Sequence, residues 1–181
     1  MSPPHAWQQP NPLKPMAHHS PPERAATILV LVRSLRHDRG AMSNLRCAFA
    51  PARRRRAWPL LARIDGIGDP VAETIAGCYA YHPEEAPGGN FGDTCRALAG
   101  QHNSFDARFR RLLACDREEL CQRIRPVILA AKSKGIPVNY ETLAADLLWW
   151  GDRVRTRWAQ AYWGGSPTAE PEATPARTEA A

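Results

Sequence analysis

Residues 139–158, NYETLAADLLWWGDRVRTRW, carry the strongest helical pattern in the chain. Asn139 is a residue type that commonly caps the start of a helix. After it, apolar side chains recur every three or four positions. They fall on one side of a helix: Leu143, Leu147, Trp150, Val154 and Trp158. The stretch therefore predicts one amphipathic helix that begins after Asn139 and buries a single face.

The same spacing recurs through most of the preceding chain. It predicts helices at residues 28–35, near 58–64, at 70–81, across 105–113 and from 117 to 131. Gly40 is expected to break the chain after the first helix, and Gly135 to cap the end of the last one. Pro126 is expected to kink that last helix. Asp116 followed by Glu119 has the form of a capping box at its start.

No segment alternates convincingly between apolar and polar residues, so we expect no sheet. The predicted fold class is all-α, a compact bundle of about six to nine helices, either as one body or as two lobes. The helical domain is expected to span residues 23–163. Residues 1–22 hold seven of the 17 prolines, and residues 164–181 are rich in Pro, Ala, Glu and Thr. Such compositions predict disordered N-terminal and C-terminal tails.

The length of 181 residues, with 44% apolar side chains, suits one core of ordinary size and excludes a large multidomain enzyme. The first 23 residues contain no apolar segment of a signal peptide, and the longest apolar run, residues 28–32, is too short to span a bilayer. We therefore expect a cytoplasmic protein with no membrane partner.

The five cysteines are an odd number, so reduced and mostly buried thiols are expected rather than a disulfide framework.

Charge is distributed unevenly along the chain. The net charge is +6, and residues 24–63 contain ten Arg against the single acid Asp38. Residues 64–102 contain six acids against Arg96, and residues 103–163 contain 11 basic and seven acidic side chains. The basic character is therefore concentrated in two blocks, which favours a polyanionic partner.

The first basic block is the strongest functional signal from the residues themselves. Its members are Arg36, Arg39, Arg46 and the run from Arg53 to Arg56. Guanidinium groups bind phosphate oxygens in pairs of hydrogen bonds, so the block favours contact with nucleic acid over a merely solvated face. The second block has six members on amphipathic helices: Arg108, Arg111, Lys132, Lys134, Arg153 and Arg157. About half of these are expected only to cover apolar surface or complement a helix end.

The segment from Ile64 to Ile75 resembles a helix-hairpin-helix motif, in which a Gly-Ile-Gly turn offers backbone N–H groups to a DNA phosphate. The turn here is Gly66-Ile67-Gly68. Asp65, Asp69 and Glu73 make it acidic, however, and a plain glycine turn between helices is the favoured interpretation.

A metal site is the weakest hypothesis that the residues suggest. Cys78 and His82 share a helical face, and Cys95 and His102 follow. Their spacing matches no compact zinc pattern, so buried cysteines are favoured over ligands. His37-Asp38 and the acids from Asp65 to Asp93 likewise suggest surface groups, because no nucleophile elbow, Walker loop or HExxH motif occurs. We expect no catalytic residues, no metal and no cofactor.

Trp149 and Trp150 are candidates for base stacking or for an interface. Only one of two adjacent helical positions can face a core, and Trp150 already lies on the apolar stripe. For Trp149, core packing is favoured over an exposed role.

The order of several motifs resembles the CasB family, the small subunit of the type I-E CRISPR surveillance complex Cascade. The matching stretches are LRHDRG at 35–40 leading to Leu45-Arg46, PLLARI at 59–64, FDARFRRLL at 105–113, GIPVNYE at 135–141 and DLLWW at 146–150. Together they span roughly residues 24–163. The long Pro-rich N-terminal tail and the acidic stretch from Asp65 to Asp93 depart from the usual pattern, and the acidic stretch is expected to face a basic neighbouring subunit.

The resemblance implies a non-enzymatic, all-helical subunit that lies as a pair of copies along the complex. Its partners would be the backbone and large subunits, a second copy of itself, the crRNA and the target DNA, with no small-molecule substrate. By position, the resemblance assigns nucleic-acid binding first to Arg39, Arg46, Arg108 and Arg111, and in addition to Arg53, Arg54, Lys132, Lys134 and Arg153.

The function expected from the sequence is thus sequence-independent binding of guide RNA, target and displaced DNA strands, which stabilises the R-loop in antiviral defence. The alternative is a stand-alone helical DNA-binding protein that uses the Gly66–Gly68 turn. A third class is a small metal-dependent or hydrolytic enzyme built on Cys78, His82, Cys95 and His102.

Overall fold

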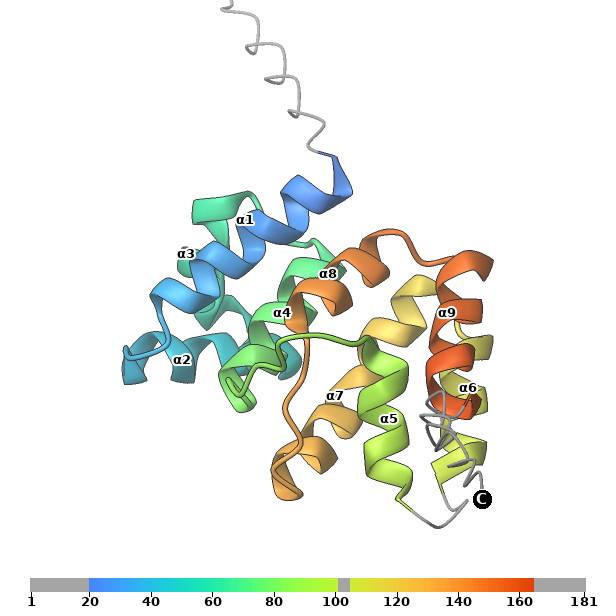
Figure 1. Cartoon of the computed structure of the whole chain (residues 1–181). Coiled ribbons are helices and arrows are strands. Elements are labelled where there is room, and N and C mark those ends of the chain that lie inside the picture. Colours follow the sequence, from blue (N-terminus) through green and yellow to red (C-terminus); the bar gives the residue numbers. More distant parts are fainter. Residues whose placement is uncertain (1–19, 101–104, 165–181) are drawn as a thin grey trace, which may run out of the picture.

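The computed structural model describes residues 20–100 and 105–164, which form nine α-helices and three short 3₁₀ turns (Figure 1). The helices are α1 (Pro21–Ser34), α2 (Arg39–Arg46), α3 (Trp58–Leu61), α4 (Pro70–Tyr81), α5 (Phe91–Ala99), α6 (Asp106–Ala114), α7 (Arg117–Ser133), α8 (Tyr140–Leu148) and α9 (Asp152–Trp163). The turns are η1 (Cys47–Phe49), η2 (Arg54–Arg56) and η3 (Ala62–Ile64). The all-α prediction is confirmed, and no strand occurs in the described ranges. The predicted tails lie outside the described residues except at their inner ends, and α1 begins at Pro21 rather than after residue 22.

The first two helices are separated before Gly40, not at it. Ser20 and Glu23 form a capping box at the start of α1. Asp38 caps α2, because its carboxylate accepts a hydrogen bond of 2.9 Å from the backbone N–H of Ala41. Gly40 therefore lies inside the first turn of α2. The expected break is correct in kind but lies a few residues earlier, at positions 35–38, because the Asp38 cap starts the new helix there.

Helix α7 forms as one element through Pro126. Asp116 caps its start with a hydrogen bond of 2.8 Å from the Glu119 N–H. The capping box is only half present, since the Glu119 carboxylate pairs with Arg123 one turn along the helix. Gly135 follows the helix with φ of 65°, the left-handed conformation that glycine adopts most easily.

The stretch 139–158 forms two helices rather than the single one predicted. Asn139 caps α8 as expected, but α8 ends at Leu148 and α9 begins at Asp152. The break lets α9 turn back toward α8. There the indole Nε1 of Trp158 donates a hydrogen bond of 2.6 Å to Asp146. This carboxylate is 2% exposed and also accepts from Arg157, so it joins the two helices across the break.

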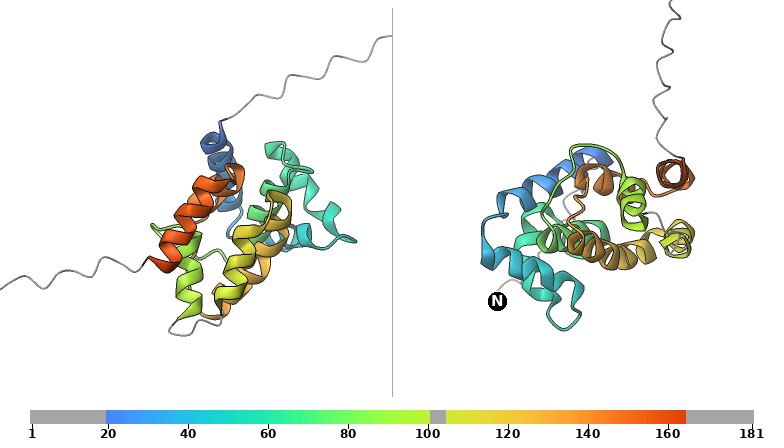
Figure 2. Two further views of the ribbon diagram at one scale, coloured as in Figure 1. Left: turned by 90° about the vertical axis from the view of Figure 1, so that its right-hand side faces the viewer. Right: turned by 60° about the horizontal axis from the view of Figure 1, so that its bottom comes forward.

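Helix α4 lies at the centre of the molecule. Every residue from Val71 to Ala80 is buried. Helices α1, α2, α7 and α8 and the turn η1 pack around it. In Figure 1, α1–α3 lie on one side of α4 and α5, α6, α7 and α9 on the other, while α8 returns to cover α1. The buried residues form one continuous core rather than two lobes, and Figure 2 shows the same arrangement from two further sides.

Polar groups at the end of α4 hold the chain that follows it. The buried hydroxyl of Tyr140 donates to the carbonyl of His82 over 2.7 Å, and His82 Nε2 lies 2.8 Å from the carbonyl of Ile136. The backbone of Val138 exchanges hydrogen bonds with Glu84 and Ala86. These contacts bind the loop after α4 to the segment before α8.

The basic and acidic segments pair with each other. Four ion pairs join residues 24–63 to residues 64–102: Arg24–Asp69, Arg33–Glu85, Arg36–Glu84 and Arg54–Glu73. Hydrogen bonds from Arg33 hold the pKa of Glu85 below its usual value. These four carboxylates thus have partners inside the chain. That the acidic stretch faces a basic neighbouring subunit stays a prediction.

All five cysteines are free and buried, as predicted. Burial raises the pKa of the Cys78 and Cys95 thiols and raises that of Cys115 to about 11. They stay protonated at neutral pH and act as small apolar side chains. None of the helices in the described ranges is long and apolar enough to cross a membrane.

The Asp146 link predicts a specific loss of stability. Asp146→Ala leaves the indole N–H of Trp158 buried without an acceptor, so we expect the free energy of unfolding to fall by about 2 kcal/mol in denaturant titrations. Asp152→Ala is the matched control, because its carboxylate is 96% exposed and, among the described residues, has an ion pair with Arg155 alone. The control is expected to change stability by less than about 0.5 kcal/mol. Equal effects of the two substitutions would contradict the proposed link.

Candidate nucleic-acid interface

The nine predicted binding residues are exposed with one exception. Arg39, Arg46, Arg53, Arg108, Arg111, Lys132, Lys134 and Arg153 are exposed, and none of them takes part in an ion pair within the described chain. Arg54 is half-buried and its guanidinium is 2.8 Å from the carboxylate of Glu73. Arg54 is therefore engaged with Glu73 inside the fold, whereas the other eight have no carboxylate partner in the described ranges, and the binding role of all nine stays a prediction.

Three arginines and two aromatic rings line one pocket near α2, η1, α4 and α7. Arg46, Arg53 and Arg125 line a pocket of about 250 Å³ with Phe49 and Tyr81, and we call this the arginine notch. The guanidinium of Arg125 lies 5.4 Å from the Phe49 ring centre and 5.3 Å from that of Tyr81. Arg46 lies 5.9 Å from the Tyr81 ring. Since Arg125 has no ion pair in the described ranges either, the notch is cationic throughout.

Backbone contacts fix the orientation of the notch residues. Arg46 is the last residue of α2, and its Nε donates a hydrogen bond of 2.8 Å to the Ala80 carbonyl near the end of α4. Phe49 follows in η1 and lies directly against Gly77, where any side chain would collide with its ring. One Nη of Arg125 lies 3.4 Å from the Tyr81 hydroxyl, and its Nε is buried without a hydrogen-bond partner.

Sequence analysis did not single out Arg125. The helical spacing could have indicated its position. Arg125 lies four residues after the buried Cys121 and thus on the face of α7 that packs against α4. Only that packing brings it to residues 46–53, which are far away in the sequence.

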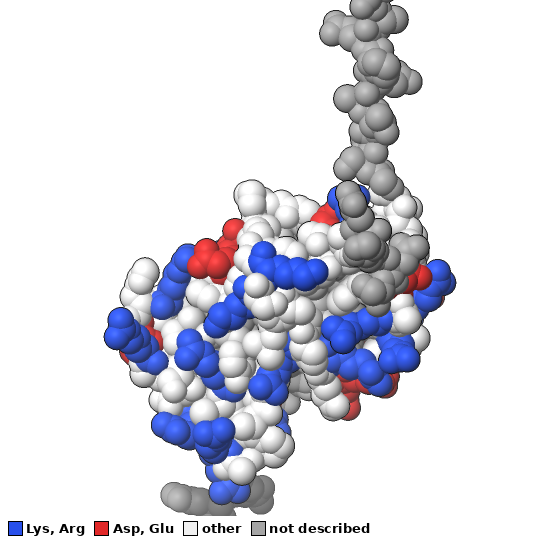
Figure 3. Space-filling view, turned by 90° about the horizontal axis from the view of Figure 1, so that it is seen from below, with Lys and Arg blue, Asp and Glu red and all other residues white. Residues whose placement is uncertain are grey.

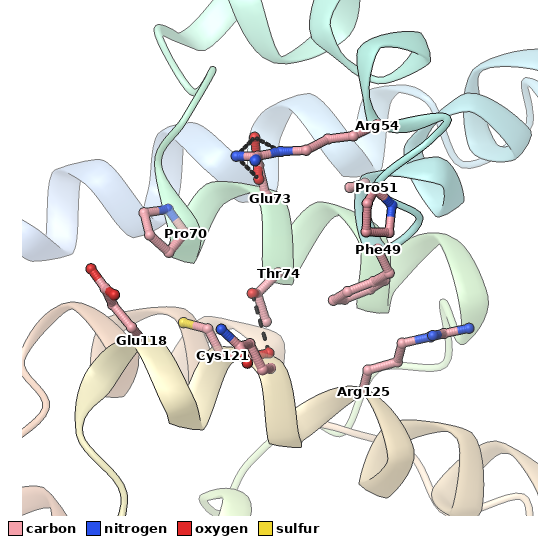
Figure 4. A pocket seen from close by; sticks show the side chains of 11 residues that line it. Phe49, Pro51, Arg54, Pro70, Glu73, Thr74, Glu118, Cys121 and Arg125 are labelled. Atoms are coloured by element: carbon pink, nitrogen blue, oxygen red, sulfur yellow. Dashed lines mark hydrogen bonds and ion pairs between the residues drawn. The ribbon is translucent and has the colours of Figure 1, made fainter.

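A second pocket of about 480 Å³ adjoins the notch (Figure 4). It lies between α4 and α7, and we call it the Phe49 pocket. Its walls are apolar at Ala48, Phe49, Pro51 and Pro70, with polar groups from Arg54, Glu73, Thr74, Glu118, Cys121, Gln122 and Arg125. Figure 4 shows the Arg54–Glu73 ion pair on one side and the hydrogen bond from Thr74 to the Cys121 carbonyl at the base.

The second predicted group lies on α6 and at the end of α7. Arg108 stacks over Phe105 with its guanidinium 5.5 Å from the ring centre, and Arg111 is exposed one turn further on. Lys132 and Lys134 lie at the end of α7, where Lys134 Nζ donates to the Leu98 carbonyl. Arg153 belongs to neither group and lies in the first turn of α9.

Figure 3 shows the lower face of the molecule, on which Lys and Arg side chains are numerous and Asp and Glu are few. Most acids within the described residues are engaged in ion pairs with nine arginines. The excess of cationic over acidic side chains gives this face a positive potential, which is suited to a phosphate backbone.

The N–H groups of both glycines in the Gly66–Gly68 turn already have acceptors inside the chain. The Gly68 N–H donates to the Glu73 carboxylate, and the N–H groups of Val71 and Ala72 donate to Asp69. Arg24 also binds the carbonyls of Ile64 and Asp65. Because carboxylates occupy the positions that a DNA phosphate would take, the geometry favours the plain glycine turn over the helix-hairpin-helix alternative.

The proposed cysteine and histidine ligands do not come together. Within the described residues no three Cys, His, Asp or Glu side chains are placed to hold a metal ion. Cys78 is fully buried and His82 is engaged with the Ile136 carbonyl, while His102 lies outside the described residues. The residues that can be placed therefore give no support to the metal-dependent enzyme hypothesis.

The expectation for Trp149 was wrong, and that for Trp150 was right. Trp150 packs against Trp158 and donates its indole N–H to the Cys115 carbonyl over 2.9 Å. Trp149 is 60% exposed, because α8 ends before it and the chain turns toward α9.

The fold and sequence were compared with known proteins. The profile of the CRISPR-associated protein Cse2 family matches residues 46–163. No curated protein matches the sequence. The fold is similar to the crystal structure of CasB from Thermus thermophilus, with a TM-score of 0.64 and 24% identity over 78% of this chain and 98% of that one.

Two further crystal structures share the fold. A CRISPR-associated protein of the Cse2 family, also from Thermus thermophilus, has a TM-score of 0.66 and 23% identity over 78% of this chain and 98% of that one. CasB from M. ruber has a TM-score of 0.58 and 22% identity over 76% of this chain and 93% of that one. The structural likeness establishes the fold, and the profile match covers more than half of the sequence. The chain therefore belongs to the CRISPR-associated Cse2 family, also known as CasB.

Proposed function

We propose that this protein is the non-catalytic small subunit of a type I-E Cascade complex. In this role it binds guide RNA, target DNA and the displaced DNA strand through basic helical surfaces and stabilises the R-loop in antiviral defence. Its partners are the backbone and large subunits, a second copy of itself, the crRNA and the target. The proposal places the protein in the cytoplasm.

The observation that carries this proposal is the set of unpaired cations on an otherwise charge-balanced fold. Nine arginines pair with acids, while Arg39, Arg46, Arg53, Arg108, Arg111, Arg125, Lys132, Lys134 and Arg153 form no ion pair in the described chain. Each phosphate that such a side chain neutralises releases counterions, which favours binding without regard to base sequence.

The energetics of R-loop formation suit such a subunit. The guide–target hybrid is about as stable as the DNA duplex that it replaces, so modest contacts to strand backbones shift the balance. This task requires positive charge on a rigid scaffold and no reaction centre. The arginine notch and the Arg108–Arg111 surface of α6 supply that charge.

Purification tests the assembly. The tagged protein, isolated from its own host, is expected to recover a stoichiometric multisubunit particle that carries short repeat-derived RNAs. Mass spectrometry of the proteins and sequencing of the bound RNA identify it. Recovery of the protein alone, or with heterogeneous DNA, would overturn the proposal.

Charge reversal tests the surface. In the assembled particle, Arg108→Glu with Arg111→Glu is expected to weaken target binding at least tenfold, by a similar factor for every guide, and to reduce the salt dependence of the affinity. Arg110→Glu with Arg123→Glu changes the net charge equally but replaces guanidinium groups that already pair with Asp106 and Glu119. This control is expected to have a much smaller effect. A loss that varied with target sequence would indicate direct base recognition instead.

A further inference from the structure

The arginine notch and the Phe49 pocket share a wall. Phe49 and Arg125 line both cavities, so the two form one continuous surface between η1, α4 and α7. A ligand that occupied both cavities would therefore contact the Phe49 ring and the Arg125 side chain.

The two ends of this surface differ in charge. In the notch, Arg46, Arg53 and Arg125 contribute guanidinium groups, and no carboxylate lines it. In the Phe49 pocket, Glu73 is neutralised by Arg54, and Glu118 lies exposed with no ion pair in the described ranges. An anionic group is therefore attracted to the notch and repelled from the pocket.

The Phe49 pocket has the properties required for a flat, uncharged group. Its walls are the Phe49 ring, two prolines and Ala48, and its volume is within the range typical of small-molecule sites. Carboxylate and amide oxygens of Glu118 and Gln122 lie on its lining, where they are able to accept hydrogen bonds from amino groups. A nucleobase combines a flat apolar face with such amino groups at its edge.

The unpartnered Nε of Arg125 is the second observation. Buried polar atoms almost always have a hydrogen-bond partner, and this donor, on a side chain that lines both cavities, lacks one. Because the atom is withdrawn from solvent, a phosphate or sugar oxygen in the notch would reach it only after a shift of the Arg125 side chain.

We propose that the arginine notch and the Phe49 pocket together form a subsite for one unstacked nucleotide of a single strand. Arg46, Arg53 and Arg125 hold the backbone phosphate, and the base enters the pocket against Phe49. The inference rests on the proposed function and goes beyond it, because binding through backbone charge alone requires no base pocket. A base inside a duplex is stacked and paired, so the subsite favours single strands.

The test uses the full chain at low ionic strength and three labelled probes: a single-stranded oligonucleotide, the same strand with abasic positions throughout, and the corresponding duplex. Fluorescence anisotropy gives the affinities. The ordinary single strand is expected to bind about tenfold more tightly than the abasic strand or the duplex.

Two substitutions separate the phosphate contact from the base contact. Gln122 is exposed and lines the Phe49 pocket, so Gln122→Trp fills the pocket without removing a core contact. This variant is expected to bind the ordinary and abasic strands equally. The control Thr156→Trp places the same bulky side chain at an exposed position of α9 outside both cavities, and it is expected to keep the tenfold difference. Arg53→Gln is expected to weaken binding of both strands by a similar factor. Circular dichroism and denaturant titration confirm that each variant is folded.

The outcomes distinguish the subsite from the proposed function. Equal affinity of the wild-type chain for ordinary and abasic strands, with both weakened by Arg53→Gln, would overturn the base pocket and leave backbone binding in place. A tenfold preference that survives Gln122→Trp would place the base elsewhere and also overturn the subsite. Failure of the chain to bind any strand would overturn it too, whereas the purification of the assembled particle decides the proposed function separately.

Discussion

The structure depends on the complete burial of α4. Ten consecutive residues, from Val71 to Ala80, are withdrawn from water. Helices of globular domains usually keep a solvent face, so this one requires neighbours all around it. The chain supplies them from elements that are far apart in sequence, namely α1 and α2 before it and α7 and α8 after it. These neighbours bury one apolar stripe each, and their outer faces remain free to carry charge.

Burial of α4 also decides which arginines remain unpaired. Glu73 lies within the buried run, and an ionised carboxylate in that position needs partners, which are Arg54 and the Gly68 N–H. Three more arginines of the first basic segment pair with acids that flank α4. What remains, including Arg39, Arg46 and Arg53, is the charge on which the proposed nucleic-acid contact depends. The packing around α4 thus has two results: some arginines form ion pairs inside the fold, and the others keep their charge at the surface.

The centre of α4 also shapes the candidate nucleotide subsite. Gly77 has no side chain, so the Phe49 ring lies directly on the helix and forms the wall shared by the notch and the neighbouring pocket (Figure 4). Arg125 reaches the same ring from α7. Phe49 and Arg125 therefore pack against the core and also form the shared wall of the two surface cavities.

The all-α class, the caps at Asn139 and Asp116 and the two basic blocks could be predicted from the amino-acid sequence, because periodicity, capping and composition are local properties. The break between Leu148 and Asp152 could not be predicted in this way, since the apolar spacing of 143–158 continues across it. Nor could the pairing of Arg54 with Glu73, the exposure of Arg53 or the position of Arg125 in the notch. These outcomes depend on contacts between residues distant in sequence, and local patterns carry no information about which distant groups packing will bring together.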